Sequence, residues 1–420
     1  MVSPPSGPKA EHSMQGQPLC LYPAYVQATG KASPHRSRPE MSDQNVWVEE
    51  LNAENFLSLE KVNIPLGQLI VLVGLNASGK SNVVRALTLL SKLGQAKDVR
   101  DTSKSDLKME SIEQLFHRSN TDLKLGIRMK IDGHSLSYEI SISPKAIIST
   151  EKVMLEKETL LNRNIEGSVK YFTDSEKDGV HHAPDSYRSI LAFLPDQSHR
   201  LIKEVKDIID GIKTYSFTPD EVRSIASSGF SLELRRNGSN LAQVLHTLLT
   251  FDRKKFLVVE GIIRDLIPEI EEINVPPVGS GENVCLAVRE QSIPQPLRYS
   301  NISDGTLRVL AFTTALYVGG TVIAFEEPEN CVHPYLFETI VDLCRKAPCQ
   351  VILTTHSPYL VNRVPPEELR LVTKTGGATR ISTVKDKKKV ERMLEEGLPL
   401  GEVWYSGELE ESHDESAGAS

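Results

Sequence analysis

The sequence predicts a two-lobed α/β fold built on a parallel β-sheet. Three short apolar runs rich in β-branched residues, at 68–73, 321–325 and 350–354, have the composition of strands that are buried on both faces. Helical patterns separate these runs, and alternating strands and helices favour a parallel sheet, because each parallel connection needs a crossover. A polar cluster follows each run, so the ends of the strands carry the candidate functional residues.

The composition excludes several classes of protein. The 420 residues carry 48 Lys+Arg and 56 Asp+Glu, a formal net charge of −8. This balance excludes a protein whose whole surface is basic and binds nucleic acid, but it is compatible with a local basic groove. The longest apolar runs fall far short of the roughly 18–20 residues that span a bilayer, so no membrane anchor is expected. Five cysteines without a Cys-x-x-Cys pair predict a reduced, cytoplasmic protein with no disulfide scaffold.

Composition and pattern divide the chain into four parts. These are a leader at 1–45, a core at 46–95 together with 296–411, an inserted lobe at 96–295 and an acidic tail at 412–420. The leader is rich in proline and serine and has no apolar period, so we expect it to be disordered. Met41 is a candidate start site, which would make the leader an upstream extension. The tail is expected to be solvated.

The inserted lobe changes its pattern halfway along. Its first part predicts an antiparallel sheet from three alternating runs, at 123–131, 135–143 and 147–155. Its second part, 197–275, is mostly of helical pattern. Apolar residues from Leu201 to Ile212 fall at helical spacing, and Ser239 is a candidate N-cap for the next helix.

A glycine-rich turn follows the first apolar run. Residues 74–81 have the spacing G-x-x-x-x-G-K-[ST], in which the glycines let the backbone wrap a phosphate closely. Lys80 would reach the β- and γ-phosphates of ATP, and the Ser81 hydroxyl would bind Mg²⁺. The helix that begins here would direct its positive end at the nucleotide. The candidate nucleotide-binding residues are Gly74, Asn76, Ala77, Ser78, Gly79, Lys80, Ser81 and Asn82.

The second and third apolar runs end in candidate catalytic residues. Glu326 and Glu327 follow the second run, and His356 follows the third. We assign Glu326 to Mg²⁺ and Glu327 to the general base that polarises the attacking water. His356 is expected to hydrogen-bond the γ-phosphate. Each residue alone would be an ordinary acidic turn or loop histidine, but their order behind the phosphate loop favours catalysis.

A further loop, at 303–308, precedes an apolar helical run. Ser303 and Gly305 at this helix start would form a second anion site, whereas the plain alternative is a simple N-cap. The order of phosphate loop, insertion, this loop, paired carboxylates and histidine resembles ABC-type ATPases. It is most similar to the head domains of the RecF and structural-maintenance-of-chromosomes (SMC) group. That resemblance implies a homodimer formed on ATP binding, in which Ser303 and Gly305 of one chain cap the ATP of the other.

The resemblance extends to a family of bacterial predicted ATPases described as RecF-like or AAA-type. Its motifs recur here as Ser-Asp-Gly-Thr-Leu-Arg at 303–308, Glu-Glu-Pro-Glu-Asn at 326–330, His-Pro at 333–334, Thr-Thr-His-Ser-Pro at 354–358 and Gly-Glu-Val-Trp at 401–404. Two features depart from the family. Leu57 stands where a base usually follows Asn-Phe, and Gln114 is only the nearest candidate for a glutamine in the loop between the lobes.

The resemblance implies an ATP hydrolase that acts in DNA repair, recombination or genome maintenance. The alternative is the ATPase sensor subunit of a defence system with a separate nuclease or effector, since the roughly sixty residues after His356 contain no acidic metal cluster. DNA and a protein effector both stay open as partners. A transporter subunit and a regulatory module without hydrolysis are disfavoured by the signature and by the paired carboxylates. Candidate DNA-contacting clusters, more commonly solvated faces, are Arg235-Arg236, Lys254-Lys255 and 385–389.

Overall fold

The computed structural model describes residues 46–409 except positions 96, 165, 175–177, 183–184, 331 and 385–386. The expected leader and acidic tail therefore lie outside the described residues. All described residues belong to one compact unit. Among them, no helix is both long enough and apolar enough to cross a membrane.

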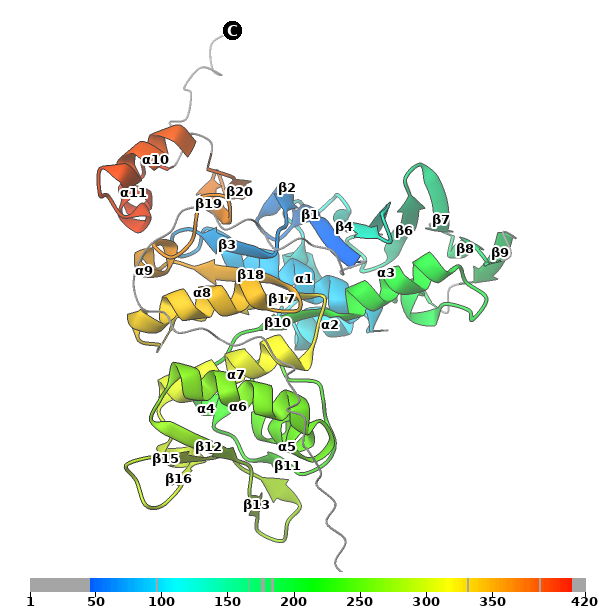
Figure 1. The fold of residues 1–420 in the computed structure, drawn as a ribbon. Coiled ribbons are helices and arrows are strands. Elements are labelled where there is room, and N and C mark those ends of the chain that lie inside the picture. The colour runs from blue at the N-terminus through cyan, green and yellow to red at the C-terminus, as the bar shows by residue number, and fades with distance from the viewer. Residues whose placement is uncertain are drawn as a thin grey trace, which may run out of the picture. The chain divides into compact units, whose positions relative to one another are not determined.

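A six-stranded sheet carries the strand ends on which the candidate site is built (Figure 1). Its order is β10-β17-β18-β3-β19-β20, and every pair is parallel except β19 with β20. The three predicted buried runs are confirmed as β3 (Leu69–Val73), β17 (Val322–Glu326) and β18 (Gln350–Thr355). The other strands are β10 (Ile212–Tyr215), β19 (Leu369–Thr375) and β20 (Ala378–Ser382). Because β18 lies between β3 and β17, the carboxyl ends of these three strands meet at one edge.

The central strands separate two hydrophobic cores. In β3, Leu69, Val71 and Val73 pack into one core, while Ile70 and Leu72 pack into the other. This alternation follows from the period of two in a strand. The helices of the first core include α7 (Asp304–Val318) and α8 (Phe337–Lys346), and those of the second include α1 (Lys80–Gly94), α2 (Val99–Ser105) and α3 (Arg200–Asp210).

An eight-stranded antiparallel sheet contributes to the second core. Its order is β2-β1-β4-β5-β6-β7-β8-β9. The strands are β1 (Val46–Phe56), β2 (Leu59–Pro65), β4 (Leu123–Ile131), β5 (His134–Ile142), β6 (Ile148–Leu155), β7 (Glu158–Arg163), β8 (Ser168–Phe172) and β9 (Asp178–His182). The three predicted alternating runs are confirmed as β4, β5 and β6. This sheet joins strands from the first part of the chain to strands of the inserted stretch through the β1–β4 pair.

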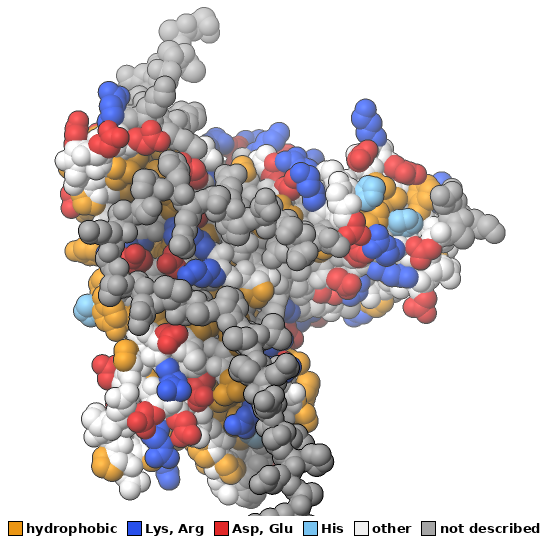
Figure 2. Space-filling model, viewed as in Figure 1, with side chains coloured by type: hydrophobic (Ala, Val, Ile, Leu, Met, Phe, Trp, Pro, Cys, Tyr) orange, Lys and Arg blue, Asp and Glu red, His pale blue; other side chains and the backbone are white. Residues whose placement is uncertain are grey.

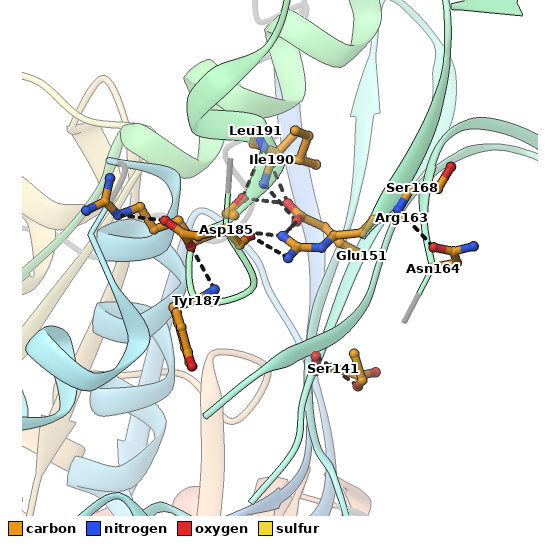
Figure 3. Close-up of polar contacts among 12 residues, drawn as sticks. Ser141, Glu151, Arg163, Asn164, Ser168, Asp185, Tyr187, Ile190 and Leu191 are labelled. Carbon is orange, nitrogen blue, oxygen red and sulfur yellow. Dashed lines mark hydrogen bonds and ion pairs between the residues drawn. The ribbon is translucent and has the colours of Figure 1, made fainter. Parts of the chain in front are cut away.

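A buried polar cluster ties this sheet to η2 (Ile190–Phe193), as Figure 3 shows. Glu151 of β6 is fully buried, and Arg163 of β7 lies beside it with its Nη1 3.9 Å from Oε2 of Glu151. The hydrogen-bond donors to Glu151 include the hydroxyls of Tyr138 and Ser189 and the backbone N–H of Ile190. Arg163 itself donates to the carbonyl oxygens of Arg188 and Asp185. Both oxygens of the Glu151 carboxylate are thus engaged inside the protein, which indicates a structural role.

The second half of the inserted stretch forms a smaller lobe on α7 (Figure 1). Its helices α4 (Pro219–Val222), α5 (Leu241–Phe251) and α6 (Arg253–Leu266) pack on α7. Two small antiparallel sheets complete it. Their strands are β11 (Ala226–Ser227), β14 (Asn283–Val284) and β13 (Pro277–Val278) in one, and β12 (Ile270–Asn274), β15 (Ala287–Glu290) and β16 (Leu297–Arg298) in the other.

Two local predictions in this stretch are wrong. Ile212 does not extend the preceding helix. α3 ends at Asp210 with Gly211 as its C-cap, and Ile212 begins β10, where it pairs with Val322. Ser239 is not the cap of α5, whose N-cap is Asn240. The Asn240 side chain makes no cap bond and instead accepts from the backbone N–H of Arg235 at 2.8 Å, so it holds the loop before the helix.

The motif at 401–404 packs on the segment that follows His356. A Cβ atom at Gly401 would lie 2.1 Å from the carbonyl oxygen of Pro358, so only glycine fits this contact between α11 (Leu400–Tyr405) and α9 (Pro358–Val361). The N–H of Gly401 also donates to Oδ1 of Asn362 at 2.6 Å. The remaining elements are α10 (Lys387–Glu395), η1 (Ile112–Leu115), η3 (Tyr299–Asn301) and η4 (Pro334–Leu336).

Candidate nucleotide site

The phosphate loop, residues 74–81, joins β3 to α1 in a turn that requires small residues. A Cβ at Gly74 would lie 2.2 Å from the carbonyl oxygen of Val372, and one at Gly79 would lie 2.0 Å from Oγ1 of Thr379. Gly79 has a φ of 109° and Ala77 a φ of 63°, both in the left-handed region that side chains disfavour. The loop is therefore a tight backbone cradle of the kind that surrounds phosphate groups.

Lys80 reaches back across this cradle. Its Nζ donates to the carbonyl oxygens of Gly74 at 2.7 Å and Leu75 at 3.0 Å. Burial lowers the pKa of Lys80, while the charges of Glu327 and Glu329 act in the opposite direction. The Ser78 hydroxyl is buried and has no hydrogen-bond partner among the described residues, whereas Ser81 is exposed in the first turn of α1.

A chain of hydroxyl and amide groups supports the loop from outside. Asn82 Nδ2 donates to Oγ of Ser58 at 2.7 Å, and Ser58 Oγ lies 2.6 Å from Oγ1 of Thr379. Thr379 Oγ1 in turn donates to the carbonyl oxygen of Ser78 at 2.9 Å. Asn82, predicted to bind nucleotide, has its side chain in this supporting chain. Thr379 was missed because no local pattern in β20 marks it.

Glu326 ends β17 and Glu327 follows it, but the two carboxylates contact different groups. Oε2 of Glu326 lies 3.2 Å from Nη2 of Arg236, which comes from the loop before α5. Glu327 has a φ of 46°, and its carboxylate contacts Nδ1 of His356 at 3.0 Å and accepts from Nδ2 of Asn330 at 2.9 Å. The structure thus brings Glu327 and His356 together, a contact that the sequence analysis did not predict.

The surroundings of Glu327 keep it ionised. Partial burial raises the pKa of Glu327. Hydrogen bonds from Asn330 and His356 and the charge of Lys80 lower this pKa by a larger amount, so the net shift is downward from 4.5. An ionised carboxylate at neutral pH can accept a proton. This is the protonation state that a general base requires.

Glu329 is a residue that sequence reasoning left without a role. Its side chain is buried, and one oxygen accepts a hydrogen bond from the Thr355 hydroxyl. The other oxygen, Oε2, has no partner among the described residues, and burial raises the pKa of this carboxyl. Its charge also acts on Lys80. A buried oxygen without a partner beside a phosphate cradle is a group that a bound ligand or water would satisfy.

Taken together, these groups suit a phosphate chain with a divalent cation. The cradle and Lys80 offer donors and positive charge, and the unpartnered hydroxyl of Ser78 points to a missing acceptor. Ser81 and Glu326 supply hydroxyl and carboxylate oxygens, the ligands that Mg²⁺ prefers. The residues present therefore fit Mg-ATP.

The signature loop, residues 303–308, begins α7. Ser303 is the N-cap, and its Oγ accepts from the backbone N–H of Thr306 at 3.1 Å. Arg308, one turn into the helix, donates to the carbonyl oxygen of Glu327 at 3.4 Å. Ser303 is exposed and Gly305 half-buried. The cap is thus observed within one chain, and a contact across a dimer stays a prediction.

The two departures from the family pattern have structural explanations. Asn55 is buried, and its side chain donates to the carbonyl oxygens of Arg118 and Thr121, so it holds the turn before β4. Leu57, in place of a base, packs against the second core. Gln114 is exposed in η1 and accepts from the N–H of Glu110, and none of its hydrogen bonds reaches the phosphate loop.

Comparison with known proteins places these features in a family. Residues 69–362 match the family model described as "AAA domain, putative AbiEii toxin, Type IV TA system". An OLD nuclease of Thermus scotoductus is 24% identical over 369 residues, which are 78% of this chain and 62% of that protein. The chain therefore spans less than two thirds of the length of this relative.

A solved Smc head shows the same fold. A Smc head bound to the C-winged helix domain of ScpA matches with a TM-score of 0.52 at 14% identity, covering 82% of this chain and 99% of that one. A Smc head with an extended coiled coil from Pyrococcus furiosus, bound to the C-terminal domain of ScpA, gives a TM-score of 0.49 at 14% identity, covering 84% and 99%. The fold is that of an ABC-type P-loop head, and the chain belongs to the family of AAA domains described as putative AbiEii toxin, Type IV TA system.

Proposed function

We propose that this protein binds and hydrolyses ATP with Mg²⁺ and that two copies close over the bound nucleotides. The observation that carries the proposal is the meeting of Glu327 and His356, 3.0 Å apart, at the sheet edge that also bears the phosphate loop. A base and a polar sensor beside a phosphate cradle are the parts that phosphoryl transfer to water needs.

Each residue would have a separate role in the reaction. The cradle and Lys80 would bind the β- and γ-phosphates, and Ser81 and Glu326 would hold Mg²⁺, which when bound offsets the charge of the phosphates. Glu327 would orient the attacking water and accept its proton. With Nδ1 of His356 in contact with Glu327, contact with the γ-phosphate would use Nε2, which donates only if it carries a proton. Positioning and electrostatics would supply most of the rate enhancement.

Exposed apolar side chains around the site support closure by a second copy. Leu75, Tyr335 and Tyr359 are 65%, 63% and 65% exposed. They lie in or just after the phosphate loop, the loop after β17 and the loop after β18. Large apolar side chains that surround polar site loops are typical of surfaces that an association buries. Ser303 and Gly305 of the partner copy would then complete the site.

The test is the mass of the Glu327→Gln protein in solution, measured by light scattering with and without Mg-ATP. We expect a shift from the 46.6 kDa of one chain to twice that mass only with Mg-ATP. Ser303→Arg in the same background is the matched variant, and it should bind ATP but stay monomeric. A monomer that binds ATP would contradict the dimer, and a protein that does not bind ATP would contradict the whole proposal.

The proposed role is DNA repair, recombination or genome maintenance, with the sensor subunit of a defence system as the second candidate. The second candidate is supported by the OLD nuclease relative, which is longer than the region matched here, and by the toxin description of the family. Repeating the mass measurement with DNA duplexes separates the two candidates. DNA that co-elutes only with the ATP-bound dimer would support the first, and a dimer that ignores DNA would support an effector protein as partner.

A further inference from the structure

A cleft of about 1000 Å³ lies next to the carboxylate of Glu326. α1 and β10 form its floor through residues such as Lys92 and Lys213. One wall consists of residues 105–108, and the other comes from the segment 230–243. None of the residues 74–81 lines it, so the cleft is distinct from the phosphate cradle.

Basic side chains predominate in this cleft. It is lined by the basic residues Arg85, Lys92, Lys97, Lys108, Lys213, Arg235 and Arg236 and by the acidic residues Asp106, Glu221, Glu233 and Glu326. The excess of three positive charges opposes the net charge of −8 of the whole chain. On the face shown in Figure 2, by contrast, the described basic and acidic side chains are interspersed. The cleft is therefore a local concentration of positive charge.

These cations fall into two groups according to their ion pairs with other described residues. Three are paired, as Lys97 with Asp106 at 2.9 Å, Lys213 with Glu233 at 3.1 Å and Arg236 with Glu326 at 3.2 Å. The four that make no ion pair among the described residues are Arg85, Lys92, Lys108 and Arg235. A half-enclosed group of cations without counter-ions favours the binding of an anion with several charges.

Lys92 is a partly buried cation of this cleft. Burial lowers the pKa of Lys92, and the charges of Glu233 and Asp106, which raise this pKa, outweigh those of Lys97 and Lys213, which lower it. Its Nζ donates to Oε1 of Gln95 at 2.9 Å, a neutral acceptor. A phosphate group in the cleft would give the Lys92 ammonium a direct ionic partner.

An aromatic pair lies at the same cleft. Phe230 lines it and is 64% exposed, and its ring packs edge-on against Phe251, which is 69% exposed, at 5.4 Å between centroids. Exposed aromatic rings beside a basic groove are typical of proteins that bind single-stranded nucleic acid, because bases stack on the rings while cations contact the phosphates. The cleft volume is at the upper end of the range for small-ligand sites.

We propose that this cleft binds a single strand of nucleic acid, with phosphates against Lys92, Lys108 and Arg235 and a base against Phe230. Arg236 connects the cleft to the nucleotide site, since its guanidinium also contacts Glu326. A phosphate that draws Arg236 away would free the Glu326 carboxylate for Mg²⁺. Strand binding would thereby promote ATP turnover, and only this second step rests on the proposed ATPase function.

The binding step is tested without ATP or Mg²⁺, so that it does not depend on the ATPase. Fluorescence anisotropy would follow a labelled oligothymidylate of about 15 nucleotides, a length within the site sizes of single-strand binders. The double variant Lys108→Glu with Arg235→Glu changes two exposed cleft residues. Its matched control is Lys152→Glu with Lys157→Glu, the same charge change on exposed residues in and just after β6, outside the cleft and outside the basic clusters named above. Circular dichroism would verify that both variants are folded.

We expect the cleft variant to raise the Kd about tenfold or more and the control to change it by less than about twofold, because lost phosphate contacts weaken binding strongly. Phe230→Ala should raise the Kd about fivefold. If the two double variants weakened strand binding equally, the cleft would not be the binding site. Equally tight binding of a duplex, or displacement of the strand by ATP or by polyglutamate at equal charge concentration, would overturn the choice of ligand.

The coupling step is tested by ATP turnover with and without the unlabelled strand. Wild-type turnover should rise when the strand is present, while Arg236→Gln should keep ATP binding and lose the stimulation. Stimulation that survives in Arg236→Gln would overturn the coupling while leaving strand binding in place. Strand binding by a protein that does not hydrolyse ATP would contradict the proposed function alone.

Discussion

Glu151 and Glu327 are both held by several hydrogen bonds, yet their environments suit opposite tasks. The Glu151 side chain is 0% exposed, and hydroxyl, backbone and guanidinium groups lie around its carboxylate (Figure 3). The Glu327 side chain is 33% exposed and lies in a loop beside the phosphate cradle. Burial raises the pKa of Glu151, whereas hydrogen bonds and Lys80 leave the pKa of Glu327 lowered despite partial burial.

The difference teaches how to separate a structural carboxylate from a reactive one. A carboxylate whose lone pairs are all used inside the protein has no capacity left for a substrate. A carboxylate that is ionised, oriented and open on one side can accept a proton from water. The comparison therefore predicts that changes at Glu327 alter chemistry and that changes at Glu151 alter stability.

The largest effect is expected from Lys80→Ala. Lys80 is the cation of the cradle, so its loss should weaken ATP binding about 100-fold or more, on the scale of two lost charge-assisted hydrogen bonds. Titration with a fluorescent ATP analogue measures this change, and Lys254→Ala serves as the control. ATP affinity within a few-fold of the parent would show that the cradle is not the binding site.

Glu327→Gln separates binding from chemistry. The amide keeps the size of the side chain but cannot accept the proton, so turnover should fall by about 10²–10⁴-fold, the usual contribution of a general base. ATP affinity should stay within about threefold, since binding rests on other groups. Phosphate release at saturating ATP measures turnover. Activity close to that of the parent would remove Glu327 from the role of base.

Glu151→Ala should act on stability alone. Removal of the carboxylate leaves the buried guanidinium of Arg163 without its partner, so we expect the free energy of unfolding to fall by about 3–5 kcal/mol. Urea denaturation followed by circular dichroism measures it, with Glu139→Ala on the exposed face of β5 as the control. ATP affinity per folded molecule should be unchanged, and a change in affinity would mean that the two regions are coupled.

The smallest effect is a pH dependence of opposite sign in the two regions. Because the pKa of Glu151 is raised above 4.5 in the folded state, the folded protein binds this proton more tightly than the unfolded chain. Stability from this group is therefore lost as pH rises from 4.5 through the raised pKa. The lowered pKa of Glu327 gives stability above 4.5 that is lost as pH falls through its folded pKa.

Glu151→Gln and Glu327→Gln, each compared with the wild type, isolate these contributions. Urea midpoints would be measured between about pH 3.5 and pH 8. The stability contributed by Glu151 should be lost as pH rises above 4.5, and the stability contributed by Glu327 should be lost as pH falls below 4.5. Parallel curves for wild type and Glu151→Gln would contradict the raised pKa. The variant lacks the titrating group but keeps the side-chain volume, which makes it the matched comparison.

The sequence by itself determined the fold class and three strands of the central sheet, and it predicted a chemical role for each loop. β3, β17 and β18 are continuous apolar runs, and the phosphate loop is a contiguous motif, so their signals lie within a few residues. The sequence also predicted that Glu327 and His356 follow strands of one parallel sheet, but their contact at 3.0 Å was first seen in the structure.

Only the tertiary structure decided which distant groups surround the site. Arg236 meets Glu326 across 90 residues, and Ser58 meets Thr379 across 321. Ile212 has a helical spacing in the sequence, yet it begins β10 and pairs with Val322 of β17. The helix stops at its C-cap Gly211, and the backbone of Ile212 then pairs with the outer side of β17. Contacts of this kind produce no periodic pattern in the sequence, because they depend on how the elements pack and not on local propensity.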